Sequence, residues 1–172
     1  MNEMLNLIHT RRSCKAYKPD MPLLDDINKV VVAGLEAASG RNLQGAKIVV
    51  ITDKATRDRL SAANAEVLGS TADPFYGAPA ILVVLADKSI RTSIYDGSLV
   101  MGNMMLAAHA IGLGSCWIHR AREVFDTPEW KSFLSEIGME GEYEGVGNLT
   151  LGYPLGELPK DKPRLDGRVF YV

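Results

Sequence analysis

One segment of the sequence, 93–113, is apolar on nearly every side of the helix that it would form, and this feature constrains the fold most. A helix that is hydrophobic all round must lie in the centre of a core or in an interface between subunits. Glycine, serine and alanine residues along the segment would let another backbone approach closely. We interpret the histidine in this segment, His109, as a packed core residue rather than a catalytic one.

The remaining patterns alternate between helix and strand. Apolar periodicity and helix start signals predict helices around residues 5–8 and over 23–38, 53–68 and 128–138. Short apolar or β-branched runs predict strands over 47–51, 80–85, 115–118 and 148–153. The run at 80–85 has almost no polar alternation, so we expect both faces of that strand to be covered. This order indicates an α+β (mixed α/β) fold with a central mixed β-sheet flanked by helices.

Length and composition indicate one globular domain over residues 1–172, with the proline-containing stretch 154–172 as an extended C-terminal arm. The first residues lack the apolar run of a signal peptide, and no stretch reaches the roughly 18 apolar residues of a membrane span. We therefore expect a cytoplasmic protein with no membrane partner. Cys14 and Cys116 form no CxxC and have no metal-ligand spacing with the histidines, so we expect free thiols and no metal site.

Two short basic segments lie near opposite ends of the chain. The N-terminal basic segment, residues 11–18, holds four cations and a serine, and the C-terminal basic segment, residues 160–164, holds three cations. The chain as a whole has a net charge of −2, so these are local features. Such clusters favour one discrete anion, such as a phosphate, over a polyanion, and we expect no nucleic-acid partner. The alternative is that both segments are solvated loops.

Several common catalytic motifs are missing from the sequence. It contains no G-x-G-x-x-G after a strand, no G-x-x-x-x-G-K-[ST], no G-x-S-x-G and no HExxH. An enzyme without a protein nucleophile, a metal site or an acid–base cluster borrows its chemistry from a cofactor.

The order of several short motifs resembles that of the FMN-dependent nitroreductase family of NAD(P)H oxidoreductases. Each motif alone is weak, but their joint order and spacing cover nearly the whole chain. They are R-R-S-C-K-A-Y at 11–17, S-G-R-N-L-Q at 39–44, A-P-A-I-L-V-V at 78–84, G-L-G-S-C-W-I at 112–118, L-G-Y-P at 151–154, and the pair Lys162 and Arg164. The resemblance implies an intertwined homodimer, non-covalent FMN, and NADH or NADPH as co-substrate.

The resemblance also implies a cofactor site, residue by residue. The FMN phosphate would be bound by Arg11, Ser13, Lys162 and Arg164, with Arg12 alongside. A cation at the pyrimidine edge, Lys15, would tune the flavin by stabilising the negative charge of its reduced form. A side chain on the helix after the first strand, Asn64, would hydrogen-bond the flavin ring. The opposite subunit would contribute Ser39, Gly40 and Asn42, and the end of one strand would pack on the ring through Trp117, Ile118 and His119. For Trp117, a plain core role is the alternative.

The sequence departs from the family pattern at residues 119–120, where His-Arg stands in place of a common Glu-Gly pair, and at Gly45-Ala46, in place of Pro-Trp. The chain is also short for the family, which implies an open substrate site. We predict a ping-pong oxidoreductase that reduces nitroaromatic, quinone or similar small acceptors, with flavin N5 rather than a side chain carrying the chemistry. The alternative is a flavin-binding store, sensor or electron carrier without robust NAD(P)H turnover. A different flavin reaction, such as dehalogenation, has no motif in its favour.

Overall fold

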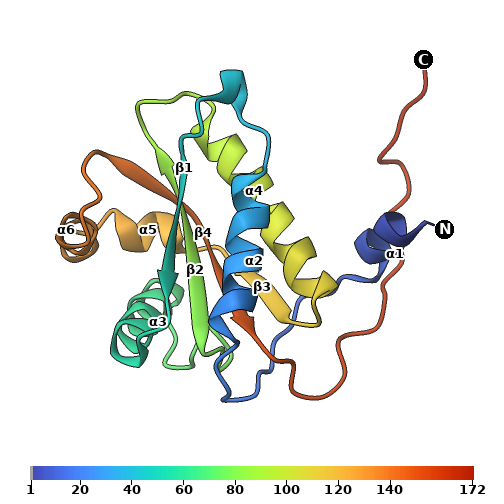
Figure 1. Cartoon of the computed structure of the whole chain (residues 1–172), viewed down its shortest axis with the longest axis horizontal. Helices are drawn as coiled ribbons and strands as arrows, with labels where there is room; N and C mark the ends of the chain where they lie inside the picture. Colours follow the sequence, from blue (N-terminus) through green and yellow to red (C-terminus); the bar gives the residue numbers. More distant parts are fainter. Residues whose placement is uncertain (1) are drawn as a thin grey trace.

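The computed structural model describes residues 2–172 and centres on a four-stranded sheet (Figure 1). The strands are β1 (Ala46–Ile51), β2 (Ala80–Asp87), β3 (Gly114–Ile118) and β4 (Tyr143–Gly152), in the spatial order β1-β2-β4-β3. All three pairings are antiparallel, so the sheet is not the mixed one that we predicted. The apolar run of β2 indicates that both its faces are covered, but it carries no information on the direction of its neighbours.

Helices cover both faces of the sheet. On one face lie α2 (Leu24–Leu35) and α4 (Ser93–Ala110), and on the other lie α3 (Lys54–Leu68), α5 (Ala121–Phe125) and α6 (Pro128–Glu136) (Figure 1). Residues of β2 contribute to the apolar clusters on both faces, and all six residues from 80 to 85 are fully buried. The expectation for this strand is confirmed.

Local chemistry accounts for most of the element boundaries. Asp53 caps α3 by accepting a hydrogen bond from the backbone N–H of Thr56, as its position in the sequence predicts. The second helix stops at Leu35, three residues before its predicted end, and the predicted strand at 148–153 begins earlier, at Tyr143. The five-residue helix α5 was not predicted, because it is shorter than the window in which helical periodicity can be recognised.

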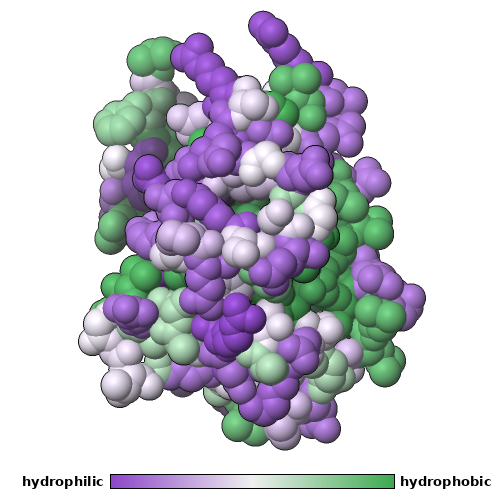
Figure 2. All heavy atoms as spheres, turned by 90° about the vertical axis from the view of Figure 1, so that its left-hand side faces the viewer, coloured by the Kyte–Doolittle hydropathy of each residue, from purple (hydrophilic) through white to green (hydrophobic). Residues whose placement is uncertain are grey.

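The long helix α4 is less enclosed than its composition predicts. It buries Val100, Met101 and Met104 against the sheet, but Tyr95 and Leu99 remain 72% and 52% exposed. The first helix, α1 (Glu3–Thr10), buries no residue at all. By contrast, Figure 2 shows hydrophilic side chains over the middle of the opposite side of the molecule, the side of α3 and α6. Within residues 2–172, no helix combines the length and the apolar character that crossing a membrane requires.

The two ends of the chain lie side by side (Figure 1). Residues 154–172 form no helix or strand beyond an isolated bridge between Tyr17 and Pro154. Two backbone hydrogen bonds flank this bridge, from the N–H of Lys18 to the carbonyl of Tyr153 and from the N–H of Leu155 to the carbonyl of Ala16, each 2.9 Å long. The start of the tail is thereby fixed to the N-terminal basic segment.

Candidate functional site

The N-terminal basic segment is anchored against β3 and β4 by its apolar side chains. The N–H of Cys14 donates to the carbonyl of Ser115 at 2.9 Å, and the Cys14 side chain is buried. The hydroxyl of Tyr17 lies 2.9 Å from the carbonyl oxygen of Cys14 and 2.7 Å from Oγ1 of Thr150. Burial raises the pKa of Tyr17 strongly, so the phenol stays neutral. With these side chains inside, Lys15 is left exposed.

The structure brings the two basic segments together. An ion pair of 2.5 Å joins the guanidinium of Arg12 to the carboxylate of Asp161. Arg12 also donates to the backbone carbonyls of His9 and Arg11, at 2.6 and 2.8 Å, and the N–H of Lys162 donates to Asp161. Arg12 therefore connects the two segments, and its guanidinium is largely used within the chain.

Arg11 is the residue whose surroundings indicate a bound anion. Its Nη1 atom is buried and has no hydrogen-bond partner among the described residues. Leaving a buried charged donor unpaired costs free energy, so a ligand oxygen at this point would be stabilising. Ser13 is half-buried nearby, and both Lys162 and Arg164 are exposed cations in the tail. The donors fit a phosphate, which guanidinium groups bind through charge-assisted hydrogen bonds.

The thiol of Cys116 on β3 reports on the position of these groups. Burial raises its pKa, while a hydrogen bond from Ser13 and the positive charges of Lys15 and Arg11 act in the opposite direction. The isolated bridge between Ser13 and Ser115 places this part of the N-terminal basic segment beside β3.

The ammonium group of Lys15 lies 5.7 Å from the centre of the Tyr76 ring. Tyr76 belongs to the loop between α3 and β2 and is 39% exposed. Its φ angle is +56°, in the left-handed region that residues with large side chains rarely adopt.

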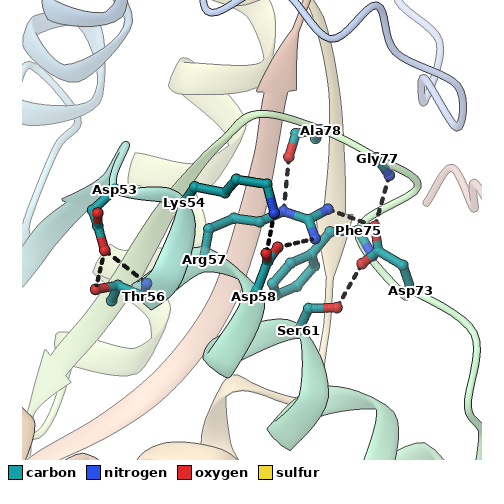
Figure 3. Close-up of polar contacts among 10 residues, drawn as sticks. All are labelled: Asp53, Lys54, Thr56, Arg57, Asp58, Ser61, Asp73, Phe75, Gly77 and Ala78. Carbon is teal, nitrogen blue, oxygen red and sulfur yellow. Dashed lines mark hydrogen bonds and ion pairs between the residues drawn. The ribbon is translucent and has the colours of Figure 1, made fainter.

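A partly buried ionic network holds this loop in place (Figure 3). The carboxylate of Asp73 accepts hydrogen bonds from the backbone N–H groups of Phe75 and Gly77, at 2.9 and 2.8 Å. It also accepts from Ser61 at 2.6 Å and pairs with Arg57 at 2.5 Å. Burial alone would raise the pKa of Asp73, but these donors together hold it below its usual value.

Our sequence analysis missed Tyr76 and this network. We treated residues 69–79 as loop by composition. The D-P-F-Y-G run at 73–77 was the available signal, since aspartate commonly accepts backbone hydrogen bonds in such turns and glycine tolerates positive φ.

The predicted residues at the end of β3 differ in exposure. Ile118 is buried on the α5 side of the sheet, Trp117 is half-buried on the α4 side, and His119 is exposed. The Trp117 ring packs on Gly147, where an added Cβ would lie only 2.3 Å from the indole nitrogen. Trp117 is therefore partly a core residue. The following residue, Arg120, has a buried Nε without a hydrogen-bond partner among the described residues.

Asn64, for which the resemblance implies a flavin contact, lies in the core. Its side chain is fully buried, its Nδ2 donates to the carbonyl of Leu60 at 2.9 Å, and its Oδ1 accepts from Asn148 at 3.0 Å. Because both ends of the amide are used inside the core, the structure does not bring Asn64 to the exposed cations.

The predicted turn of residues 39–44 lies at the N-terminal end of α4. The N–H of Gly40 donates to the buried carboxylate of Asp96 at 3.1 Å, and an added Cβ at Gly40 would lie 2.5 Å from Oγ1 of Thr92. The N–H of Gln44 donates to the hydroxyl of Ser39, and the side chain of Gln44 donates to that of Asn42. Glycine is thus needed here for close packing, and the polar side chains are fixed at the surface.

Within one chain, this turn and the N-terminal basic segment contact opposite ends of α4. The turn contacts Asp96, whereas Thr10 contacts His109 through a hydrogen bond of 2.9 Å. Thirteen helical residues separate Asp96 from His109, or about 20 Å at 1.5 Å per residue. His109 is half-buried rather than enclosed, and burial, together with the charges of Arg11 and Arg12, lowers its pKa.

The part of the chain that the structure describes contains no group of three or more His, Cys, Asp or Glu side chains that could hold a metal ion. Both cysteines are free and buried. The candidate site is therefore a cationic surface built by both ends of the chain beside β3.

Comparison with known proteins identifies the family. The model of the nitroreductase family matches residues 8–72 and 67–153. The chain belongs to the nitroreductase family. A protein of Archaeoglobus fulgidus, provisionally named NADH dehydrogenase/NAD(P)H nitroreductase, is 30% identical over 98% of this chain and 94% of its own length. The NADPH-flavin oxidoreductase of Vibrio harveyi is 30% identical over 98% of this chain and 72% of its own length.

The fold agrees with this assignment. A nitroreductase of Bacteroides fragilis, solved with bound FMN, superposes with a TM-score of 0.89 at 27% identity, over the full length of both chains. The resemblance stated from the sequence motifs and the α+β fold class are confirmed. The direction of the strands is the detail that the motifs left undetermined.

Proposed function

We propose that this chain is an FMN-dependent oxidoreductase that oxidises NADH or NADPH and reduces nitroaromatic, quinone or similar small acceptors. The observation that carries the proposal is Nη1 of Arg11, which is buried and has no partner among the described residues, next to Arg12, whose ion pair with Asp161 brings in the C-terminal basic segment. The relatives support the same reading, because the Vibrio protein is named an NADPH-flavin oxidoreductase and the Bacteroides structure contains FMN.

In this proposal, Arg11 and Ser13 bind the FMN phosphate together with Lys162 and Arg164 from the tail. Arg12 holds the tail in place through Asp161. Bound FMN would supply the redox chemistry, accepting a hydride at N5 and passing it on to the second substrate in a ping-pong cycle. Lys15 would stabilise the negative charge that reduced flavin carries near N1.

The strand end 117–119 would pack against the flavin ring, with the exposed His119 facing the substrate side. The chain is short for the family, which leaves little room for helical insertions around that site, so we expect the ring to be accessible to several flat acceptors. Arg120 adds a cation where relatives commonly have a Glu-Gly pair.

We also propose that the working unit is a homodimer. Exposed apolar side chains gather on α1, α2, α4 and the tail, including Leu24, Tyr95, Phe170 and Tyr171 at 68, 72, 84 and 94% exposure. A contiguous apolar surface of this kind marks an interface. A second copy would also supply Ser39, Gly40 and Asn42, which within one chain lie about 20 Å along α4 from the N-terminal basic segment.

The decisive experiment is an anaerobic titration of the purified flavoprotein with NADH and NADPH. Loss of the visible flavin absorbance, and its return on adding a quinone or nitroaromatic, would support the enzyme. Tightly bound FMN that neither nucleotide reduces would support the alternative, a flavin store, sensor or electron carrier.

Light scattering at micromolar concentration tests the dimer, and a monomer mass with flavin still bound would contradict the shared site. A cytoplasmic location stays a prediction and fits two free thiols.

A further inference from the structure

The loop between α3 and β2 holds an aromatic residue in a strained conformation directly beneath the cation that is expected to tune the flavin. Tyr76 has a φ of +56°, and the next residue, Gly77, has a φ of +76°. Glycine adopts this region without cost, whereas an aromatic side chain does not. Such strain persists where the surrounding structure enforces it, and it is commonly found at functional sites.

The surroundings of Tyr76 do enforce it. Asp73 accepts the N–H groups on both sides of Tyr76, those of Phe75 and Gly77, and so closes the loop around it (Figure 3). Arg57 fixes Asp73 through an ion pair and also donates to the carbonyl of Ala78 at 3.0 Å, beyond the other end of the loop. The fully buried ring of Phe75 lies 5.5 Å from the Arg57 guanidinium and anchors the loop to the core.

The consequence of this construction is the position of the Tyr76 ring. Its neighbours Phe75 and Ala78 are buried, but Tyr76 is exposed beside Lys15, whose ammonium lies 5.7 Å from the ring centre. That distance lies within the range of a cation–π interaction. Among residues 2–172, no carboxylate forms an ion pair with Lys15, so this ring is the partner that the structure gives it.

We propose that Tyr76 is a positioning residue for Lys15: its ring holds the ammonium group at the flavin edge, and the network of Asp73 and Arg57 exists to hold that ring. This inference rests on the proposed function, because it assumes that Lys15 faces FMN. A lysine has a flexible four-carbon stem, and an exposed ammonium samples many positions unless a partner restricts it. An aromatic face restricts the ammonium without neutralising its charge, as a carboxylate would, so the full charge remains available to the reduced flavin.

The first test measures the flavin midpoint potential in the wild type and in four variants. Lys15→Ala should lower the potential, because the reduced flavin loses its counter-charge. Tyr76→Leu should lower it in the same direction, although Lys15 is still present, and Tyr76→Phe should keep the wild-type value because it keeps the aromatic face. The double variant Lys15→Ala/Tyr76→Leu should lie no lower than Lys15→Ala alone, because Tyr76 acts through Lys15.

The second test combines the melting temperature of the apoprotein, which reports the strain, with the midpoint potential of the flavin-bound protein. Tyr76→Gly should raise the melting temperature of the apoprotein, since glycine adopts φ +56° freely, while it lowers the flavin potential as Tyr76→Leu does. A side chain kept for structure would give the opposite result, a lower melting temperature with an unchanged potential.

The outcomes separate the two proposals. If the wild-type protein binds no FMN, the proposed function fails, whatever the apoprotein shows. If FMN binds and Lys15→Ala lowers the potential, but Tyr76→Leu leaves it unchanged or adds in full to Lys15→Ala, the positioning role of Tyr76 is wrong and the flavin site stands.

Discussion

The sheet and the two ends of the chain differ in how completely the rest of the chain buries them. In β2, six consecutive apolar residues are fully buried between helices on both faces. At the ends, α1 buries nothing and the last four residues of the tail are at least 67% exposed. The comparison teaches that the core is complete within one chain, whereas the ends are left largely exposed. The FMN and the second copy that we propose would cover them.

The polar groups show the same difference. In the core, the hydroxyl of Thr150 donates to the carbonyl of Cys116 at 3.1 Å and lies 2.7 Å from the hydroxyl of Tyr17. Near the N-terminus, Arg11 has a buried donor with no partner among the described residues. Ser93 Oγ and Asn148 Oδ1 are also buried without a partner among the described residues, but both groups are neutral. A charged donor costs more to leave unpaired, so we explain Arg11 by a group that binds from outside.

The largest expected effect comes from removing one end. Truncation after Pro159 removes Lys162, Arg164 and the ion-pair partner of Arg12. Two charge-assisted contacts at roughly 1.5–3 kcal/mol each amount to about 3–6 kcal/mol, so FMN affinity should fall by about 100-fold or more. The melting temperature of the apoprotein should change little if the core is complete without the tail.

A full-length control separates charge from the arm itself. The double variant Lys162→Gln/Arg164→Gln should lose FMN affinity but keep the dimer, whereas the truncated chain should lose both. Fluorescence titration with FMN and light scattering measure the two properties. Wild-type FMN affinity in the truncated chain would show that the tail takes no part in the site.

A single cation gives the next largest effect. Arg11→Ala should weaken FMN binding by about 1.5–3 kcal/mol, or about 10- to 150-fold, and Arg164→Ala should act in the same range. Arg168→Ala, which removes a tail cation outside the C-terminal basic segment, is the matched control and should bind FMN normally. The assignment of the phosphate site is wrong if Arg11→Ala and Arg164→Ala both bind FMN as the wild type does.

The core should respond to volume rather than to charge. A Cβ added at Gly145 on β4 would lie 2.2 Å from the backbone carbon and oxygen of Ala121, so Gly145→Ala should destabilise the fold by about 1–3 kcal/mol. Gly102 in α4 has open space around it, and Gly102→Ala should stabilise the helix by roughly 0.5–1 kcal/mol. Urea denaturation of both apoproteins measures this, and equal stabilities would contradict the close approach of α5 to β4.

The sequence predicts the position of the core elements better than their pairing. The core elements with strong local signals, such as the apolar run 80–85 and the Asp53 cap of α3, are found where they were predicted. Strand direction was not predicted, because apolarity indicates burial and carries no sign of orientation. The start of β4 was missed because the glycines at 145 and 147 interrupt the pattern, although both are needed for close packing.

The sequence predicted the charged residues of the candidate site but missed Tyr76. Clustered charge makes Arg11, Lys162 and Arg164 anion-binding candidates, since a local group of cations favours a discrete anion. Family position alone predicted that Asn64 contacts the flavin; in the structure its amide pairs with Asn148 in the core, and the flavin contact stays a prediction. Tyr76 was missed because its function depends on a backbone angle and on a contact with residue 15, sixty-one positions away, and neither leaves a local pattern.

The smallest expected effect tests the network that lies between the core and the site. The pKa of Asp73 is held below its usual value of about 3.9, so the folded state binds a proton there less readily than the unfolded chain does. The stabilisation is therefore fully present above about pH 4 and is lost as the pH falls further. Since Asp73 is about one-third exposed, the contribution is about 1 kcal/mol or less after screening.

Asp73→Asn should lose less stability than the wild type between pH 5 and pH 3 in urea denaturation, and Asp166→Asn in the exposed tail should follow the wild type. A steeper loss in Asp73→Asn than in the wild type would mean that the carboxylate is not held ionised by Arg57, and the loop would then need another explanation for its shape.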